Sequence, residues 1–336
     1  MKNKILQLKE KLGTQVAILA HHYQAQEIVE IADLTGDSLE LAQKIPHLTA
    51  KYLIFCGVHF MGETAAILAA KGQKVFMPEP QAGCVMANTA PTFLVQKVVE
   101  ELTSLGKKVI PLTYVNSTAE IKALCGRLGG STCTSANARQ MLSWALKQGD
   151  LVLFLPDKNL GQNTGKSLGL SAKDMATISL TNLKELKSIV SKKLLLWPGV
   201  CAVHFKYKPK HLIQIRQKDS QARIVVHPEC SPEVVSLSDA NGSTSFIIKY
   251  VKNAPAGSKI YVGTEENLVK RLQKTYQGQK EVLSLYPVCC SNMARTRLEQ
   301  VLETLEHFPA AKEITVSEKL STWAKKALTT MFEVCS

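Results

Sequence analysis

The sequence lacks any hydrophobic run long enough to cross a membrane. Its longest apolar segments, such as residues 52–58 and 151–156, have the length of β-strands, whereas a membrane-spanning helix needs about 20 apolar residues. The N-terminus also lacks the pattern of a signal peptide, because polar residues interrupt it: Gln7, Lys9, Glu10 and Lys11. We therefore expect a cytoplasmic protein with no membrane partner.

Cysteine pairs with the spacing of a structural zinc site are absent as well. The chain has nine cysteines, but no two of them are separated by two residues, which is the usual spacing in structural zinc sites. An odd number of cysteines in a reducing compartment also argues against a framework of disulfides. We expect Cys56, Cys125 and Cys133 to be buried, inert thiols.

The chain has no concentrated basic stripe, although its net charge is +13. Lysines and arginines are scattered, in pairs such as Lys107-Lys108 and Lys192-Lys193, which is typical of solvated helix faces. A nucleic-acid-binding protein would need a basic patch or a recognisable module, so we expect no nucleic-acid partner. A positive field does attract small anionic substrates to a cleft.

Strand-like and helix-like segments alternate along the whole chain, which indicates an α/β fold with parallel sheets. Three times, a strand-like run ends in two polar residues that are two positions apart. Residues two apart in a strand point to the same side, and ligands of α/β folds bind at the carboxyl ends of strands. The three pairs are His21 and Tyr23, Tyr114 and Asn116, and His227 and Glu229.

A hydroxyl residue follows each pair, directly before a helix-like run. Ser38 and Thr244 each lie 17 residues after the histidine of their pair, and Ser135 lies 21 residues after Tyr114. Such residues are expected to cap the helices. A helix N-terminus also binds anions, so capping and substrate binding are compatible.

The third strand-like run of each repeat leads into a proline and then a cysteine. Cys84 and Cys290 both lie 63 residues after the histidine of their repeat, and Cys201 lies 87 residues after Tyr114. The middle repeat is longer, and we expect loop material around residues 161–165. Three similar units of this kind predict three domains around a pseudo-threefold axis, with the three cysteines and the polar strand ends at its centre.

We therefore expect three similar three-layer αβα domains with short parallel sheets. The first repeat covers residues 1–88, the second 89–203 and the third 204–290, and the C-terminal helices in 291–336 pack on the first.

Three convergent cysteines favour an iron–sulfur cluster. A [4Fe–4S] cluster normally has four thiolate ligands, so three would leave one iron open to act as a Lewis acid on a substrate. Tyr23, Tyr114 and Glu229 are candidates for proton transfer. The motifs contain no arginine, so carboxylate and phosphate groups would be bound by six other side chains: His21, Ser38, Asn116, Ser135, His227 and Thr244.

Several segments closely resemble the quinolinate synthase family, in order from about residue 16 to about residue 305. They are LAHHYQ (19–24), GDSL (36–39), YVNS (114–117), CTSANA (133–138), PDKNLG (156–161), HPEC (227–230) and GSTS (242–245). Cys84, Cys201 and Cys290 match the positions of the family's cluster ligands, and the nine polar residues above match its substrate and catalytic positions.

The resemblance implies a transferase of NAD biosynthesis that condenses iminoaspartate with dihydroxyacetone phosphate. It also implies one [4Fe–4S] cluster per chain and transient contact with L-aspartate oxidase or aspartate dehydrogenase, which supply the unstable substrate. This chain departs from the family pattern at His22, where Asn is common, and at Gly129-Gly130. The adjacent Cys289 and Cys290 leave the third ligand ambiguous, although equal spacing favours Cys290.

Three alternatives remain open at this point. An aconitase-like hydro-lyase could use the same cysteines on another hydroxy acid, and a catalytically inactive relative could retain the motifs. A non-enzymatic iron–sulfur sensor is less consistent with the sequence, because a sensor would be expected to supply a fourth thiolate.

Overall fold

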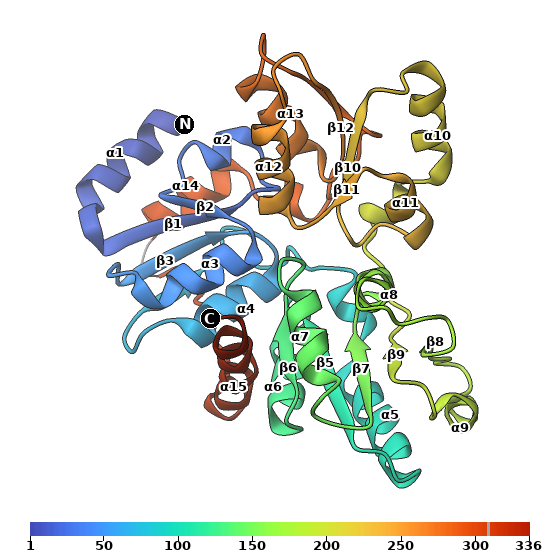
Figure 1. The fold of residues 1–336 in the computed structure, drawn as a ribbon. Coiled ribbons are helices and arrows are strands. Elements are labelled where there is room, and N and C mark those ends of the chain that lie inside the picture. The colour runs from blue at the N-terminus through green and yellow to red at the C-terminus, as the bar shows by residue number, and fades with distance from the viewer. Residues whose placement is uncertain (308–309) are drawn as a thin grey trace. The chain divides into compact units, whose positions relative to one another are not determined.

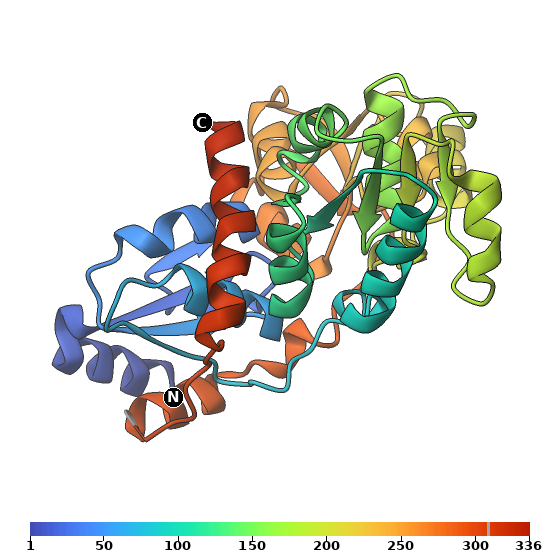
Figure 2. The same ribbon diagram turned by 90° about the horizontal axis from the view of Figure 1, so that it is seen from below.

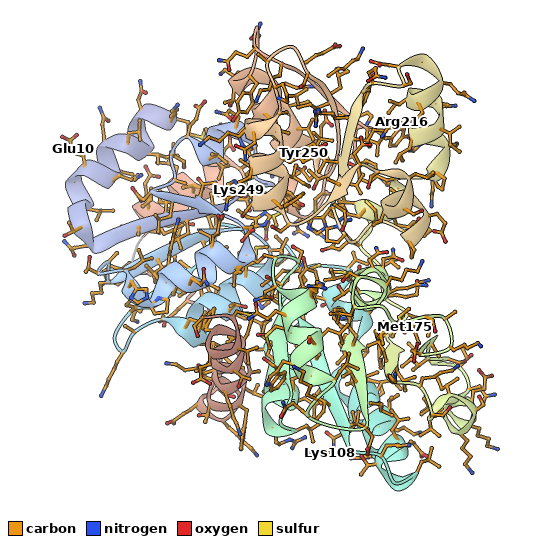
Figure 3. The ribbon with its side chains drawn as sticks, viewed as in Figure 1. Glu10, Lys108, Met175, Arg216, Lys249 and Tyr250 are labelled. Carbon is orange, nitrogen blue, oxygen red and sulfur yellow. The ribbon has the colours of Figure 1, made fainter. Side chains whose placement is uncertain are left out.

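The computed structural model describes residues 1–307 and 310–336. The chain forms three short parallel sheets flanked by helices (Figure 1), which confirms the predicted α/β class. The central strands are buried along their length, as expected for parallel sheets that are covered on both faces. Exposed charged side chains such as that of Glu10 point away from the ribbon into solvent (Figure 3).

The first sheet has the strand order β2-β1-β3-β4. Its strands are β1 (Val16–His21), β2 (Leu34–Gly36), β3 (Tyr52–Cys56) and β4 (Lys74–Phe76). The helical segments of this region are α1 (Lys2–Leu12), η1 (Gly13–Gln15), α2 (Gln26–Val29), α3 (Ser38–Lys44), η2 (Ile45–His47) and α4 (His59–Leu68).

The second sheet has the order β6-β5-β7-β9-β8. Its strands are β5 (Val109–Tyr114), β6 (Ser131–Cys133), β7 (Leu151–Leu155), β8 (Met175–Thr177) and β9 (Leu194–Leu196). The helical segments are η3 (Ala87–Thr89), α5 (Thr92–Ser104), α6 (Ala119–Arg127), α7 (Ala138–Ala145), α8 (Lys158–Ser167), η4 (Leu183–Glu185), α9 (Leu186–Ile189) and η5 (His204–Lys206).

The third sheet repeats the order of the first, β11-β10-β12-β13. Its strands are β10 (Arg223–Val226), β11 (Ala240–Asn241), β12 (Lys259–Gly263) and β13 (Glu281–Ser284). The remaining helical segments are α10 (Pro209–Lys218), α11 (Pro232–Leu237), α12 (Thr244–Asn253), α13 (Glu266–Thr275), η6 (Met293–Arg295), α14 (Leu298–Glu306) and α15 (Glu318–Cys335).

The extra length of the middle repeat forms regular structure. Residues 161–165, where a loop was expected, lie within α8, because Asp157 caps this helix by accepting a hydrogen bond from the Leu160 N–H. The additional residues form the edge strand β8 and the short helix α9. The order of the other four strands therefore matches that of the four-stranded sheets.

Contacts divide the described chain into two compact units. Unit 1 comprises Met1–Cys84, Lys210–Val225 and Ser243–Val316, and unit 2 comprises Val85–Pro209, Val226–Gly242 and Ser317–Ser336. The predicted division into three repeats around a pseudo-threefold axis stays a prediction. Among the described residues, no helix combines the length and the apolar character needed to cross a bilayer.

The two C-terminal helices pack in different places. Helix α14 contacts α1, and its Val301 lies in the unit 1 core with Ile5 and Ile18. Helix α15 contacts α6, α7 and β6 of unit 2 (Figure 2). The expectation that both helices pack on the first repeat is therefore wrong for α15, because an amphipathic helix does not specify in its sequence which apolar surface it covers.

The contact between α6 and α15 depends on a glycine. A Cβ atom at Gly126 would lie 2.0 Å from the backbone oxygen of Trp323, so a larger residue forces the helices apart. We expect Gly126→Ala to destabilise unit 2 by about 1–3 kcal/mol, the usual cost of overpacking. Thermal unfolding measures this effect, and Thr322→Ala, on an exposed position of α15, should leave the midpoint nearly unchanged. An unchanged midpoint in the glycine variant would contradict this account.

Candidate active site

The predicted polar pairs lie at the carboxyl ends of three equivalent strands. β1 ends at His21, β5 ends at Tyr114, and β10 ends directly before His227. The second residue of each pair follows two positions later in a loop. This placement agrees with the sequence pattern, since each of these strands is the second strand of its sheet order.

Two of the pairs share a local hydrogen bond that orients the histidine. The Tyr23 N–H donates to His21 Nδ1 at 3.1 Å, and the Glu229 N–H donates to His227 Nδ1 at 3.3 Å. Because Nδ1 accepts in both rings, the neutral imidazole carries its proton on Nε2. Burial and, to a smaller extent, the neighbouring His204 lower the pKa of His227 to about 3, so His227 is neutral at physiological pH.

Tyr23 belongs to a partly buried hydroxyl cluster of unit 1. Its Oη lies 2.7 Å from Thr264 Oγ1, and Thr244 Oγ1 donates to the same Oη at 3.3 Å. The His21 and Tyr23 rings meet edge to face with their centroids 4.6 Å apart. The predicted residues Tyr23, His21 and Thr244 therefore lie together, and Thr264 joins them although the sequence pattern did not indicate it.

The helix caps are provided by neighbours of the predicted hydroxyl residues. Asp37 caps α3 by accepting the N–H groups of Leu39 and Glu40, both at 3.0 Å, while Ser243 caps α12. The capping role expected of Ser38 and Thr244 is therefore wrong by one residue, because these two occupy the first helical position.

The third hydroxyl residue, Ser135, lies in the loop between β6 and α7. The N-cap position of α7 is Asn137, so the expected capping role of Ser135 is also wrong. Asn137 Oδ1 instead accepts the Thr134 N–H at 2.7 Å and orders this loop. None of the three predicted hydroxyl residues is therefore the N-cap of its helix.

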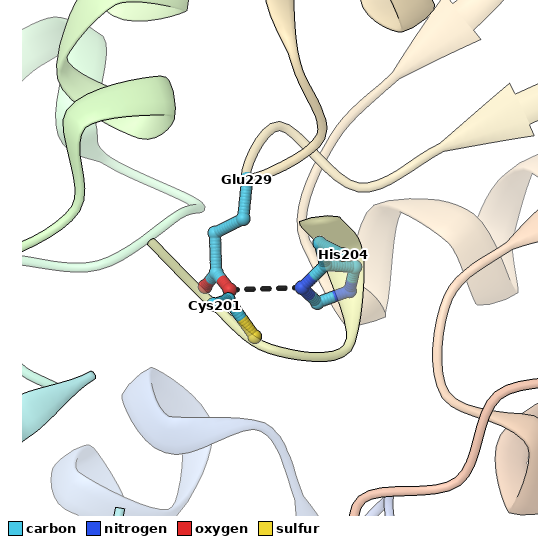
Figure 4. A group of neighbouring side chains, drawn as sticks. All are labelled: Cys201, His204 and Glu229. Atoms are coloured by element: carbon cyan, nitrogen blue, oxygen red, sulfur yellow. Dashed lines mark hydrogen bonds and ion pairs between the residues drawn. The ribbon is translucent and has the colours of Figure 1, made fainter. Parts of the chain in front are cut away.

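Unit 2 holds a buried group of titratable side chains (Figure 4). His204 Nδ1 lies 2.8 Å from Glu229 Oε2. The rings of His204 and His227 stack with their centroids 4.3 Å apart. Burial raises the pKa of Glu229, but the neighbouring His227 and His204 and hydrogen bonds from His204 and Tyr114 lower it more strongly. Glu229 is therefore a carboxylate in direct contact with Tyr114.

Asn116, the partner of Tyr114 in its pair, has an acceptor atom with no protein donor. Its Oδ1 is buried and has no hydrogen-bond partner among residues 1–307 and 310–336. A buried acceptor without a partner is costly. A donor group of a bound ligand would satisfy it.

The three predicted ligand cysteines share one backbone register. In each repeat, a 3₁₀ helix begins three residues after the cysteine: η3, η5 and η6. In each, the N–H five residues after the cysteine donates to the carbonyl two residues after it, at 3.0 Å for Thr89, 3.1 Å for Lys206 and 3.2 Å for Arg295.

A second backbone hydrogen bond lies on the other side of each cysteine. The carbonyl two residues before the cysteine accepts from the first residue of the helix that follows the second strand. The distances are 2.7 Å for His59 to Ala82, 2.8 Å for Lys158 to Gly199 and 2.9 Å for Glu266 to Val288. Relative to both hydrogen bonds, Cys290 occupies the position of Cys84 and Cys201, whereas Cys289 lies one residue before it.

The burial of the cysteines separates these three from most of the others. Cys84, Cys201 and Cys290 are partly exposed, whereas Cys56, Cys125 and Cys133 are buried as predicted. Burial raises the pKa of Cys56 and Cys125 to about 12, and an iron ligand must be a thiolate. The donor set at the three equivalent loops therefore suits an iron–sulfur cluster. Cys84 and Cys290 lie in unit 1 and Cys201 in unit 2, so their convergence stays a prediction.

The structure also brings mixed donor atoms together within unit 2. One ligand atom each of Cys201, His204 and Glu229 lies within 4.8 Å of the others, a spacing at which they could hold a metal ion. The sequence pattern does not indicate a role for His204. It lies three residues after Cys201, where the other repeats have Ala87 and Met293, so a comparison of the repeats could not identify it.

The fold and the site define an α/β protein with polar strand ends and three equivalent cysteine loops. A family model described as Quinolinate synthetase A protein matches residues 3–333. The chain belongs to this family.

Three relatives show the extent of the similarity. Quinolinate synthase of Bacillus pumilus (strain SAFR-032) is 46% identical over 312 residues, which cover 91% of this chain and 84% of the relative. Quinolinate synthase of Bacillus velezensis (strain DSM 23117 / BGSC 10A6 / LMG 26770 / FZB42) is 45% identical over 339 residues, with 98% and 92% covered. Quinolinate synthase of Geobacillus sp. (strain WCH70) is 43% identical over 340 residues, with 98% and 92% covered.

The depressed pKa of His227 predicts a pH dependence of stability. Its pKa is lowered from 6.5 to about 3 in the folded state, so between these values the unfolded chain binds more protons. The free energy of unfolding should therefore fall as the pH decreases from about 6.5 towards 3, by at most about 1.4 kcal/mol per pH unit. In His227→Asn this contribution should be missing.

Anaerobic urea unfolding of both proteins at several pH values measures the difference in slope. Taking the difference between the two proteins cancels the contributions of titrating groups that do not interact with His227. Equal slopes would show that His227 is not held neutral.

Proposed function

We propose that the chain is a quinolinate synthase that condenses iminoaspartate with dihydroxyacetone phosphate, with loss of phosphate and water. It would thus act as a transferase in NAD biosynthesis. The observation that carries this proposal is the family match over residues 3–333, supported by relatives named quinolinate synthase that cover nearly the whole chain.

The proposed cofactor is one [4Fe–4S] cluster per chain, held by Cys84, Cys201 and Cys290. The shared backbone register of these residues supports the choice of three among nine cysteines, and it favours Cys290 over Cys289. When bound, such a cluster supplies an iron without a protein thiolate, which acts as a Lewis acid on a substrate oxygen.

Proton transfer is assigned to Tyr23, Tyr114 and Glu229. Glu229 is ionised and hydrogen-bonded to Tyr114 and His204, so it can accept a proton while these donors hold its position. Tyr23 Oη shares hydrogen bonds with two threonine hydroxyls, which can pass a proton to or from the tyrosine.

Substrate binding is assigned to His21, Ser38, Asn116, Ser135, His227 and Thr244. The two histidines use Nδ1 as an acceptor from their own loops, so Nε2 carries the proton and can donate to a carboxylate or phosphate oxygen. Ser38 and Ser135 are not N-cap residues, so their hydroxyls can donate to an anion. Thr244 is not an N-cap residue either, and because its hydroxyl donates to Tyr23 Oη, its oxygen can accept from a substrate hydroxyl. Asn116 Oδ1 suits a substrate donor such as an amine or hydroxyl.

The biological setting follows from the chemistry of the substrates. Iminoaspartate hydrolyses readily, which favours transient contact with the enzyme that makes it, L-aspartate oxidase or aspartate dehydrogenase. The net charge of +13 favours the approach of two anionic substrates. We place the reaction in the cytoplasm.

The proposal predicts quinolinate formation by anaerobically purified protein. Iminoaspartate and dihydroxyacetone phosphate should yield quinolinate, and Glu229→Gln should lower kcat by about 100-fold or more because it removes the proton acceptor. Iron content should be unchanged in this variant. If the wild-type protein retains its cluster but forms no quinolinate, and instead dehydrates another hydroxy acid, the aconitase-like alternative is correct.

The cluster assignment predicts a pattern among single cysteine variants. Cys84→Ala, Cys201→Ala and Cys290→Ala should each lose the brown colour and most of the iron, whereas Cys289→Ala should retain both. His204→Ala separates this cluster from a single metal ion bound by Cys201, His204 and Glu229. Iron should remain in His204→Ala if the cysteines hold a cluster, and loss of all iron in that variant would favour the single-ion site.

A further inference from the structure

Helices α8 and α13 begin with the same arrangement of polar residues. Each helix is capped by an acidic residue that follows a strand of a parallel sheet, and this acid has an asparagine two positions later and a second amide or guanidinium donor six positions later. These residues are Asp157, Asn159 and Asn163 in α8, and Glu265, Asn267 and Arg271 in α13.

In unit 1, the donors of α13 hold the loop that carries Tyr23. Asn267 Nδ2 donates to the Tyr23 carbonyl at 3.2 Å, and Arg271 Nη1 donates to the Gln24 carbonyl at 2.8 Å. The other Arg271 nitrogen, Nη2, donates to the carbonyl of His22. The carbonyl of Tyr23 and the carbonyls of the two residues beside it are therefore bound by two side chains of one helix.

In unit 2, the donors of α8 hold the loop that carries Glu229 in the same way. Asn159 Nδ2 donates to the Glu229 carbonyl at 3.1 Å. Asn163 Nδ2 donates to the carbonyls of Pro228 and Cys230, at 2.8 and 2.9 Å. Position for position, the second residue of the motif binds the central carbonyl and the third binds the two flanking carbonyls, as in unit 1.

The acidic residue of each motif binds a predicted ligand cysteine. The Cys201 N–H donates to Asp157 Oδ2 at 3.1 Å, and the Cys290 N–H donates to Glu265 Oε1 at 3.3 Å. In α13, Glu265 also accepts from the Asn267 side chain at 3.0 Å. One helix start thus connects a cysteine loop with the loop of a proposed catalytic residue.

Burial gives these hydrogen bonds their importance. Asp157 and Glu265 are fully buried, and Asn159 and Asn163 are nearly so. Buried carbonyls and amides need partners, and hydrogen bonds around a metal ligand typically alter metal affinity or activity by about 10- to 100-fold when they are removed. A displacement of about 1 Å in a reacting group has a comparable effect on rate.

The first repeat lacks this arrangement. The positions of α4 that correspond to the three motif residues are Val58, Phe60 and Thr64, and the Thr64 hydroxyl donates within its own helix to the Phe60 carbonyl at 2.8 Å. The cysteine loop of this repeat is held by backbone hydrogen bonds and by His59 Nδ1, which lies 2.9 Å from the Pro80 carbonyl.

We propose that the motif of an acid, an asparagine and a second donor is a positioning element. It fixes Cys290 relative to Tyr23, and Cys201 relative to Glu229. This inference rests on the proposed function for the roles of these four residues. Asp157, Asn159, Asn163, Glu265, Asn267 and Arg271 are positioning residues, and they act through the backbone of the loops that they hold.

The acidic residues are tested by the rate at which a chelator removes iron anaerobically. Asp157→Ala and Glu265→Ala should each lose iron about tenfold faster than the wild-type protein. Asp157→Asn and Glu265→Gln retain an oxygen that accepts the cysteine N–H, so they should restore a rate near that of the wild type. Equal rates in the alanine and amide variants would overturn the cysteine-holding role, and this readout does not depend on quinolinate formation.

The asparagines are tested by separating kcat from KM. Asn159→Ala and Asn267→Ala should lower kcat by about 10- to 100-fold with normal iron content and little change in KM. The matched control is Asn253→Ala, at an exposed position of α12, which should behave as the wild type does. Unchanged kcat in both variants would overturn the loop-positioning role. If wild-type protein makes no quinolinate, the proposed function fails, and the iron-release series alone decides the inference.

Discussion

The candidate site depends on the backbone hydrogen bond between each cysteine loop and the helix that follows the second strand. The bond occurs in all three repeats at 2.7–2.9 Å, and it sets the position of each cysteine relative to its sheet. Because it is a main-chain contact, it is independent of side-chain identity at the donor, which is His59, Lys158 or Glu266. The side chains around this constant frame are then free to differ between repeats.

Two of the repeats add buried side chains to this frame and one does not. Asp157 and Glu265 bind the N–H of their cysteines, whereas the first repeat has Val58 at the same position. Polar groups that are buried in this way must be fully paired, which ties each to one geometry. The result is a repeated architecture with unequal chemistry, in which Tyr23 in unit 1 and Glu229 in unit 2 are held by similar contacts.

Much of the fold and of the site follows from spacing in the sequence. Buried parallel strands read as continuous apolar runs, so the strands that precede His21, Tyr114 and His227 could be recognised. Equal spacing favours Cys290 over its neighbour Cys289, and the two backbone hydrogen bonds of the structure align the same residue with Cys84 and Cys201. Capping was predicted one residue late at Ser38 and Thr244, because Asp37 and Ser243 are equally good caps.

By itself, the sequence determined the α/β class, the repeated strand ends and the family, since these depend on local periodicity and short motifs. Only the tertiary structure placed α15 against α6, joined His204 to Glu229, and connected Asn267 and Asn159 to loops that are distant in the chain. The physical reason is that a side-chain amide or imidazole can form chemically equivalent hydrogen bonds with many polar groups of the chain. Packing alone decides which of them lies within hydrogen-bonding distance.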